Sequence, residues 1–342
     1  MTISLRENIC YINVAQFKGD PNTKTYNREC SKHVTLTNKK ILVTGAGGFL
    51  GKHLVAALRD RGVSQIHTPD STDADLRIWE CCKKVVTNSD VVIHLAAKVG
   101  GIGFNRKYPG ELLYDNAIMG LQLMEAARQA GVKKFVAVGT VCAYPKFVPT
   151  PFKEDDIWNG YPEETNAPYG IAKKLLLAQA QAYRNQYGFN AIYLLPTNIY
   201  GPGDHTDPED SHVIPALIEK VKQAKRLNAP YIECWGTGSA TRDFLFVKDA
   251  AEGIIKATEE YDGSDPVNLG SGRETSIKEL TQTIRTLLDY KGEVRWDATK
   301  PDGQPRRVLD TSRAETFGFK ATTTLEEGLR QTLTDRTLHA EG

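Results

Sequence analysis

The stretch that decides the fold is Ile41-Leu42-Val43-Thr44-Gly45-Ala46-Gly47-Gly48-Phe49-Leu50-Gly51. Its order predicts an apolar strand, a glycine turn and then a helix whose apolar face continues over residues 54–58. In such a unit Gly45 can make the tight turn, Gly48 lets a pyrophosphate approach the backbone at the helix N-terminus, and Gly51 allows close helix–strand packing. Because a bare glycine triplet also occurs in ordinary turns, the flanking strand and helix decide the interpretation. The stretch therefore predicts a dinucleotide-binding site.

Further strand–helix units follow this first one. Strand-like runs at residues 90–97 and 134–139 are separated by helical spacing, and the pattern repeats to about Tyr200. This alternation predicts a parallel sheet covered by helices on both faces, the Rossmann-type doubly wound α/β fold. Residues 244–247 and 266–269 are predicted to be short strands that return to the same sheet.

The sequence changes character after residues 201–204 (GPGD), where an acidic, polar loop begins. At 342 residues the chain is near the upper limit for one hydrophobic core, so we expect a second, smaller domain. The predicted parts are an N-terminal extension (1–38), a dinucleotide-binding domain (39–200, with a returning segment at about 244–270) and a smaller α/β substrate-binding domain (201–243 and 271–335).

Composition excludes several functional classes. The 43 Lys and Arg residues balance 42 Asp and Glu residues, which argues against nucleic acid or an anionic membrane as the main partner. No apolar run is long enough to span a bilayer, and residues 1–38 lack the apolar core of a secretion signal. The six cysteines show no metal-ligand spacing, so we predict no metal site and a reducing, cytoplasmic location.

A candidate catalytic pair lies at Tyr169 and Lys173, in the run YGIAK. Residues four positions apart on a helix share one face, so the lysine can hold the tyrosine hydroxyl ready to give or take a proton. Thr165 and Asn166 are cap-type residues, and Pro168 suits only the first turn, so the helix is predicted to begin just before Tyr169. Taken alone the pair is also common on amphipathic helices, and its weight depends on the dinucleotide stretch upstream.

Several motifs together carry a family resemblance. The glycine turn, the Tyr-x-x-x-Lys pair and residues 196–202 (PTNIYGP) resemble the extended short-chain dehydrogenase/reductases. More narrowly, four segments in the same order resemble the GDP-L-fucose synthase family: 97–102 (AKVGGI), 139–146 (GTVCAYPK), 211–217 (SHVIPAL) and 300–303 (KPDG). The resemblance runs from about Lys39 to the C-terminal region. It implies epimerisation of GDP-4-keto-6-deoxy-D-mannose at C3 and C5 and reduction at C4 with NADPH, giving GDP-L-fucose.

The resemblance assigns roles that suit this chemistry. A C4 ketone acidifies the hydrogens on C3 and C5, so epimerisation needs one group to remove a proton and another to return one from the opposite face; Cys142 and His212 are implied as this pair. Tyr169 is implied to protonate the C4 oxygen, with Lys173 lowering its pKa and contacting the nicotinamide ribose. Thr140 is implied to bond the ketone oxygen, where the family commonly has serine. Outside the motifs, Cys142 would be read as a small buried hydrophobe and His212 as a solvated side chain.

The resemblance also implies the binding residues. For the substrate, Lys220 and Arg242 would face the diphosphate, Trp235 would line the cleft, and Asp302 would contact the nucleoside. Arg307 could add a phosphate contact, and Asn198 and Val213 complete the predicted substrate set. The predicted cofactor contacts are Gly45, Gly48, Phe49, Leu50, Gly51, Asp70, Ala96, Ala97, Tyr169, Lys173, Pro196, Asn198, Ile199 and His212.

The cofactor preference is a departure from the family. Its members use NADP(H), and several hold the 2′-phosphate with an arginine in the glycine turn and another after the second strand. Here the turn position is Gly47, and residues 64–71 contain no arginine. Asp70 follows Gly51 by 19 residues, close to where an acid would bond a ribose 2′-hydroxyl and repel a phosphate, although His67 and Ser71 could still accommodate one. The local chemistry therefore favours NAD(H).

Two other functions remain open. One is a related nucleotide-sugar 4-reductase or epimerase that acts on another deoxy or heptose sugar. The other is a catalytically silent nucleotide sensor, which is disfavoured because all five predicted catalytic side chains are chemically intact. The helices expected at residues 109–129 and 167–187 resemble those through which family members pair, so we expect a homodimer. The expected small-molecule partner is a GDP-sugar substrate.

Overall fold

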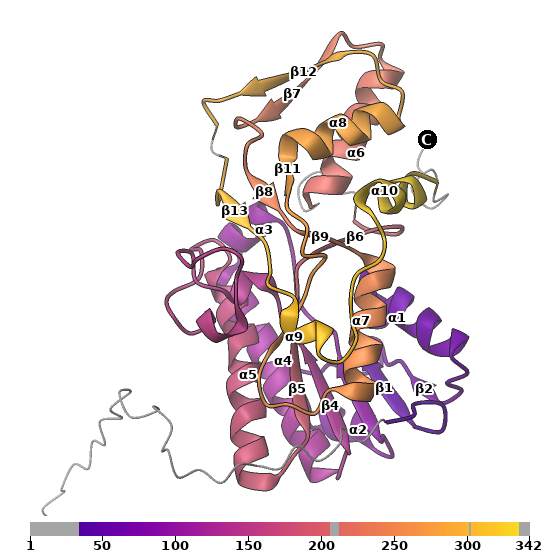
Figure 1. Cartoon of the computed structure of the whole chain (residues 1–342). Helices are drawn as coiled ribbons and strands as arrows, with labels where there is room; N and C mark the ends of the chain where they lie inside the picture. The colour runs from indigo at the N-terminus through magenta and orange to yellow at the C-terminus, as the bar shows by residue number, and fades with distance from the viewer. Residues whose placement is uncertain (1–33, 206–211, 301, 335–342) are drawn as a thin grey trace, which may run out of the picture. The chain divides into compact units, whose positions relative to one another are not determined.

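The computed structural model describes residues 34–205, 212–300 and 302–334 (Figure 1). Most of the predicted extension 1–38, and residues 206–211 of the predicted acidic loop, therefore lie outside the described residues. The described residues all belong to one unit, His33–Gly342. The bounds of the dinucleotide-binding and substrate-binding domains stay a prediction.

A six-stranded parallel sheet forms the centre of this unit, with the strand order β10-β5-β4-β3-β1-β2. Its strands are β1 (Ile41–Thr44), β2 (Ile66–His67), β3 (Val91–His94), β4 (Lys134–Val138), β5 (Ala191–Pro196) and β10 (Val267–Leu269). The chain runs from β1 to β2 on one side and then crosses to β3 on the other, which creates a topological switch point between β1 and β3. This order confirms the predicted Rossmann-type fold.

Helices cover both faces of the sheet (Figure 1). One face packs against α2 (Trp79–Val86), α4 (Pro109–Gln129) and α5 (Ala167–Tyr187), and the other against α1 (Phe49–Asp60) and α7 (Val247–Glu260). Successive strand residues enter opposite clusters, as Leu42 does relative to Ile41 and Val43. Because both faces are buried, the strands read as continuous apolar runs, the pattern from which the sheet was predicted.

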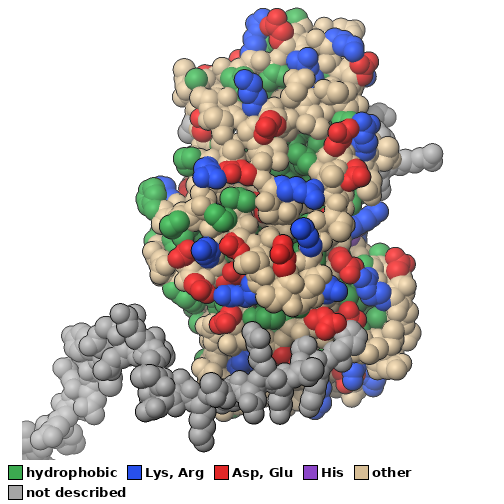
Figure 2. All heavy atoms as spheres, viewed as in Figure 1, with side chains coloured by type: hydrophobic (Ala, Val, Ile, Leu, Met, Phe, Trp, Pro, Cys, Tyr) green, Lys and Arg blue, Asp and Glu red, His purple; other side chains and the backbone are tan. Residues whose placement is uncertain are grey.

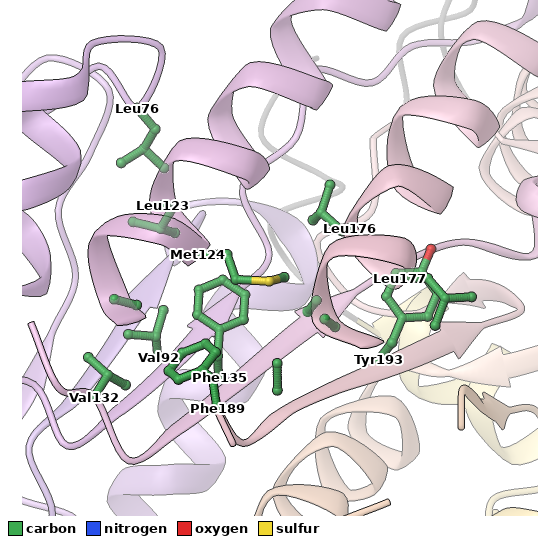
Figure 3. Close-up of a cluster of buried hydrophobic side chains, with 14 of the residues drawn as sticks. Leu76, Val92, Leu123, Met124, Val132, Phe135, Leu176, Leu177, Phe189 and Tyr193 are labelled. Carbon is green, nitrogen blue, oxygen red and sulfur yellow. The ribbon is translucent and has the colours of Figure 1, made fainter. Parts of the chain in front are cut away.

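Figure 3 shows the cluster on the first face. Phe135 of β4 and Phe189 lie against Met124 of α4, and Leu176 and Leu177 of α5 complete the layer. These side chains are buried and anchor α5 along its length, so the N-terminal turn of α5 is held at a fixed height above the sheet.

A second group of elements lies above the main sheet in Figure 1. β6 (Asn198–Tyr200) pairs with β9 (Phe244–Phe246), β7 (Tyr231–Trp235) pairs with β12 (Glu293–Asp297), and β8 (Thr241–Arg242) lies between β11 (Thr275–Ser276) and β13 (Arg306–Arg307). α6 (Val213–Arg226), α8 (Ile277–Leu287) and α10 (Leu325–Thr334) form a third buried cluster with these strands. The shorter elements are α3 (Ile102–Lys107), the 3₁₀ turns η2 (Val141–Ala143) and η3 (Glu154–Asp156), and α9 (Ser312–Glu315).

One strand prediction is wrong. Residues 244–246 form β9, which pairs with β6 rather than with the main sheet, whereas residues 267–269 do join the main sheet beside β5. Both segments are short apolar runs, so their sequences alone do not distinguish the two sheets.

The surface carries no sign of a membrane or nucleic-acid face in the view shown. Among the described helices, none combines the length and the apolar character that crossing a membrane requires. Figure 2 shows Lys and Arg side chains interspersed with Asp and Glu side chains across the visible face. This mixing agrees with the near-zero net charge of the sequence.

A buried asparagine links the sheet to the C-terminal segment. The side-chain oxygen of Asn268 accepts a hydrogen bond from Tyr144 Oη (2.7 Å), and its Nδ2 donates to the carbonyl oxygens of Phe152 (2.9 Å) and Asp310 (3.0 Å). Its backbone N–H donates to Glu154 Oε1 (2.9 Å). Asn268 thus fastens the loop after η2 to β10 and to the chain entering α9.

Replacing this residue tests its importance for stability. Asn268→Leu would leave the Tyr144 hydroxyl and the carbonyl oxygen of Asp310 without their recorded partner, and each such buried group costs about 1–3 kcal/mol. The carbonyl oxygen of Phe152 keeps the hydrogen bond from Asp310 N (2.9 Å). We expect a loss of at least about 2 kcal/mol in the free energy of unfolding, measured by urea denaturation. Asn159→Leu is the matched control, because Asn159 is exposed and bonds only Asp156 among the described residues. Equal stability of the two variants would contradict a linking role.

Candidate active site

Helix α5 presents Tyr169 and Lys173 from its first two turns. The helix begins at Ala167, with Pro168 in its first turn, as the sequence predicts. Asn166 occupies the N-cap position but makes no capping hydrogen bond; its Nδ2 donates to Glu163 Oε2 (2.7 Å). Lys173 is buried, and its Nζ lies 5.9 Å from the centre of the Tyr169 ring. The helix therefore places an ammonium beside a phenol, the arrangement expected from the sequence.

Burial sets the proton affinity of both groups. It lowers the pKa of Lys173 to about 8, because the charged form loses its hydration. Burial first, and neighbouring Cys142 second, raise the pKa of Tyr169 above its usual range. Burial and Cys142 are the causes of this upward shift, and the expected lowering of the pKa of Tyr169 by Lys173 stays a prediction. Tyr169 consequently keeps its proton at neutral pH, as a proton donor must.

Buried polar groups beneath α5 hold Lys173 in position, and sequence reasoning missed them. Tyr193 Oη of β5 donates a hydrogen bond to the backbone oxygen of Lys173 (3.0 Å). His94 lies at the end of β3 with Nδ1 2.8 Å from Thr44 Oγ1, and burial followed by Lys173 holds its pKa well below the usual value. Among the described residues, His94 Nε2 has no hydrogen-bond partner. The sequence did offer a signal for Thr44 and His94, because each is a polar residue at the end of an apolar strand.

The turn η2 carries Thr140 and Cys142 to the start of α5. Thr140 Oγ1 accepts a hydrogen bond from the backbone N–H of Cys142 (3.2 Å), so its own hydrogen stays free to donate. Gly170 packs directly on this turn, because a Cβ at Gly170 would overlap the carbonyl oxygen of Cys142. The close approach brings Tyr169, Thr140 and Cys142 to one place. A glycine inside the Tyr-x-x-x-Lys motif was visible in the sequence, but its role was not.

Two arginines approach this place from the small sheet. Arg307 Nη1 lies 3.8 Å from Cys142 Sγ, while its Nε (3.2 Å) and Nη2 (2.9 Å) donate to Gln304 Oε1. Arg242 Nη1 donates to the backbone oxygens of Thr241 and Gln304, both at 2.7 Å. Burial and Arg307 lower the pKa of Arg242 to about 10. The family resemblance suggested a phosphate contact for Arg307. In the structure, its guanidinium lies beside the Cys142 thiol.

His212 stands apart from these residues, at the N-cap of α6. Its side chain is 68% exposed, and its Nδ1 lies 3.8 Å from Asp204 Oδ1. The Asp204 carboxylate raises the pKa of His212 although burial acts in the opposite direction. The recorded contact of His212 is thus with Asp204, a residue that sequence reasoning did not single out, and not with Cys142. Val213, the next residue, is the first of α6.

The glycine turn fits a dinucleotide pyrophosphate. Gly45 has a positive φ of 72°, and a Cβ there would lie 2.7 Å from the backbone nitrogen of Ala96. A Cβ at Gly51 would overlap Gly45 O, whereas one at Gly47 would meet nothing within 4 Å. Gly48 caps α1 without a side-chain hydrogen bond, so no capping side chain occupies the first N–H groups of α1, which include those of Phe49 and Leu50. Ala96 and Ala97 follow β3 across the switch point.

The predicted ribose ligand Asp70 has structural partners. Its Oδ1 accepts hydrogen bonds from Thr72 N (2.8 Å), Thr72 Oγ1 (2.7 Å) and Asp73 N (3.0 Å), and these bonds lower its pKa. Asp70 therefore stabilises its own turn, three residues beyond the end of β2. Among the described residues, no hydrogen bond to its Oδ2 is recorded, so one carboxylate oxygen remains available to a ligand.

The segment after β5 is held by a neighbouring strand. Asn198 Nδ2 (2.9 Å) and Thr197 Oγ1 (3.1 Å) both donate to the backbone oxygen of Asp243. Pro196 ends β5, and Ile199 packs between two of the buried clusters. Asn198 thus uses one of its two amide N–H groups on the protein, which leaves the other N–H and the side-chain oxygen for a ligand.

The remaining predicted substrate residues lie around β7. Trp235 is 69% exposed, with Lys300 Nζ 5.9 Å from its ring centre. Lys220 Nζ donates to the backbone oxygen of Glu233 (2.7 Å). Asp302 accepts from Thr237 N (2.7 Å) and Thr237 Oγ1 (2.8 Å), so its carboxylate fixes the turn after β7. The described residues contain no group of three potential metal ligands.

Comparison with known proteins gives the chain its relatives. Residues 41–270 match the model of the NAD dependent epimerase/dehydratase family. The chain is 38% identical to "GDP-L-fucose synthase 1" of Arabidopsis thaliana, with 86% of this chain and 91% of that protein covered. It is 35% identical to "GDP-L-fucose synthase" of Escherichia coli, covering 87% and 96%. It is 34% identical to "GDP-L-colitose synthase" of Yersinia pseudotuberculosis, covering 86% and 96%.

A solved structure gives the same relationship. The GDP-L-fucose synthetase of Naegleria fowleri bound to NADP superposes with a TM-score of 0.80 at 27% identity, covering 91% of this chain and 98% of that one. The family match covers more than half of the 342 residues. The chain therefore belongs to the NAD dependent epimerase/dehydratase family and is, within it, a relative of the GDP-L-fucose synthases.

Proposed function

We propose that this protein is an NAD(P)-dependent epimerase/reductase that converts GDP-4-keto-6-deoxy-D-mannose to GDP-L-fucose. One observation carries the proposal: Gly170 lets the start of α5 rest on η2, which brings a phenol, a hydroxyl and a thiol together beside a buried lysine. A simple ketone reductase needs no thiol at this place. The curated relatives named GDP-L-fucose synthase support the same substrate.

The thiol and the imidazole serve the epimerisation. Cys142 Sγ removes a proton from C3 and then from C5, and Arg307 Nη1 lies 3.8 Å from the sulfur that acts as base. His212 delivers a proton to the opposite face of each carbon. The two groups come from separate elements, η2 and the N-cap of α6, as two-sided chemistry requires.

The residues of α5 and η2 serve the reduction. A bound nicotinamide would supply the hydride for C4. Tyr169 gives its proton to the C4 oxygen, and its raised pKa keeps that proton in place until the oxygen becomes basic. Thr140 Oγ1, already accepting from Cys142 N, donates its hydrogen to the same oxygen. Lys173 would hold the nicotinamide ribose hydroxyls.

The substrate diphosphate requires positive charge. Arg242 is half-buried and bonds two backbone oxygens, and among the described residues it has no carboxylate partner, so an anion of the substrate would neutralise it. Lys220 would add positive charge for the diphosphate, and exposed Trp235 would offer a ring face for stacking. Asp302 positions the turn after β7 in this proposal.

The relative named GDP-L-colitose synthase supports a second candidate. The same side chains would epimerise and reduce another 4-keto-deoxy sugar, and 4-keto heptoses belong to the same chemical class. Product NMR after incubation with each keto-sugar nucleotide distinguishes these substrates.

The cofactor preference follows from Asp70 and the absence of arginine at residues 64–71. The free carboxylate oxygen of Asp70 can accept a hydrogen bond from a ribose 2′-hydroxyl, whereas a 2′-phosphate would bring like charge against it. We therefore propose that the enzyme uses NADH at least as well as NADPH.

The remaining proposals concern assembly and location. Leu113 and Tyr114 of α4 and Leu175 of α5 are exposed apolar side chains on the two helices that we expect to pair in a homodimer, which sedimentation equilibrium would detect. The described cysteines Cys81, Cys82, Cys142 and Cys234 are free thiols, which suits a cytoplasmic location.

Separate roles for thiol and phenol predict separate failures. Cys142→Ser should block deuterium uptake at C3 and C5 while some unepimerised ketone is still reduced. Tyr169→Phe should slow reduction while uptake continues. Each loss should be about 10²–10⁴-fold in its own step, measured by product NMR in D₂O and by cofactor oxidation. Parallel loss of both steps in both variants would contradict the division, and no turnover of the substrate by the unmodified enzyme would contradict the function.

Adjacent arginines on β13 give a matched test of the thiol's neighbour. Arg307→Met removes the guanidinium beside Cys142, and a contact to a charged group is worth about 1.5–3 kcal/mol, so deuterium uptake should slow at least about tenfold. Arg306→Met is the control, because Arg306 pairs with Glu274 instead (2.7 Å). Similar uptake rates for both variants would show that Arg307 does not act on the thiol.

The cofactor proposal is tested by a charge reversal. The unmodified enzyme should give a kcat/KM with NADH at least equal to that with NADPH, and Asp70→Arg should shift the ratio toward NADPH by providing a guanidinium for the 2′-phosphate. Asp73→Arg, in the same turn, is the control for added charge. A strong NADPH preference in the unmodified enzyme would show that His67, Ser71 or backbone amides hold the phosphate.

A further inference from the structure

The proposed acid, His212, occupies an electrostatically unfavourable place. It is the N-cap of α6, a helix of 14 residues, where the unpaired N–H groups create a partial positive charge. A cation at this end of a helix is destabilised. Residues 213–218, the first six of α6, carry no charged side chain that could compensate. The helix start alone would therefore disfavour the imidazolium form of His212, which is the form that a proton donor needs.

Asp204 opposes the helix. Its side chain is only 6% exposed, its Oδ1 accepts a hydrogen bond from His205 N (2.8 Å), and the same oxygen lies 3.8 Å from His212 Nδ1. Its Oδ2 is buried and has no hydrogen-bond partner among the described residues. A buried carboxylate with one oxygen left without a hydrogen bond is stabilised by a nearby cation. Within the described residues, His212 is the cation recorded against it.

The turn that carries Asp204 is fixed independently of His212. Gly203 has a positive φ of 80°, which favours glycine. The backbone oxygen of Pro202 lies 2.8 Å from His53 Nε2 of α1, so this turn is tied to the helix of the glycine loop. Among the described residues, two further titratable groups lie at this turn: His53, which is engaged with the carbonyl oxygen of Pro202, and exposed His205, whose backbone N–H bonds Asp204. The carboxylate of Asp204 is held in place before any ligand arrives.

We propose that Asp204 is a positioning residue that keeps His212 as an imidazolium and directs its Nε2–H toward the substrate. This inference rests on the proposed function, in which His212 returns the proton. Nδ1–H points toward Asp204, and Nε2–H is the proton that passes to the carbanion at C3 or C5. The product is a ketone with a new C–H bond and a neutral imidazole that retains Nδ1–H. Solvent then reprotonates Nε2, and the Cys142 thiol returns its proton to solvent.

The surroundings of His212 act on its pKa in opposite directions. The Asp204 carboxylate raises the pKa of His212 and burial lowers it, and the net direction is upward. The positive helix start acts in the same direction as burial. An acid works while it is protonated, which is below its pKa. Removing the carboxylate should therefore leave the helix effect unopposed and move the alkaline limb of proton return to lower pH.

Asp204→Asn tests the proposal, because the amide keeps the size and removes the charge. In ¹³C-histidine NMR without substrate, the titration midpoint of His212 should fall by at least about one pH unit. Deuterium uptake at C3 and C5 should fall about tenfold above the new midpoint and stay near the original rate below it. Reduction of an already epimerised 4-keto sugar should change less than about twofold. His212→Asn assigns the NMR signal.

Two controls separate charge from structure. Asp204→Glu keeps a carboxylate and should restore most of the midpoint, whereas Asp289→Asn changes the net charge equally at a remote pair with Lys291 and should change nothing. An unchanged midpoint in Asp204→Asn would overturn the proposal. If Asp204→Asn did not fold, the NMR titration of the unmodified protein would still test the proposal, because a His212 midpoint at or below about 6.5 would overturn it. The NMR result is independent of the substrate, so failure of the proposed function would be seen separately as absent turnover.

Discussion

The candidate site depends on one close approach, that of Gly170 to the carbonyl oxygen of Cys142. A side chain at position 170 would lift the start of α5 off η2, and Tyr169 would then no longer face Thr140 and Cys142. The remaining anchors support this contact from below: Tyr193 bonds the backbone of Lys173, and Leu176 and Leu177 bury the next turn of the helix. The chemistry proposed for the site is thus fixed by backbone packing before any side-chain interaction is considered.

The charges around this contact form a consistent set. Burial makes Lys173 easier to discharge and Tyr169 harder to ionise, while Arg242 and Arg307 bring positive charge toward the thiol from the small sheet. A cationic side of the cleft suits a diphosphate and a thiolate, and a protonated phenol suits an oxygen that gains charge during reduction. The raised pKa of Tyr169 therefore keeps its proton in place for the proposed reduction step.

The sequence predicts what local patterns control. The glycine turn, the start of α5 and the parallel sheet were predicted because strand runs, helix starts and glycine spacing are local signals. The pairing of β9 with β6, the self-contained turn of Asp70 and the raised pKa of Tyr169 were not predicted, because each depends on contacts between distant segments. Family resemblance named Cys142 and His212, yet the residues that adjust them, Arg307 beside the thiol and Asp204 beside the imidazole, emerged from the fold.

The hydrogen bonds of Asn268 also constrain when the site can form during synthesis. Asn268 joins Phe152, which follows η2, to Asp310, near the C-terminal end of the described residues. A nascent chain that has not yet exposed residue 310 outside the ribosome lacks this closure, even though every predicted catalytic side chain has already been made. The closure therefore needs a segment that is made after every predicted catalytic side chain, and removal of residues 308–334 would leave all of those side chains in a chain that lacks it.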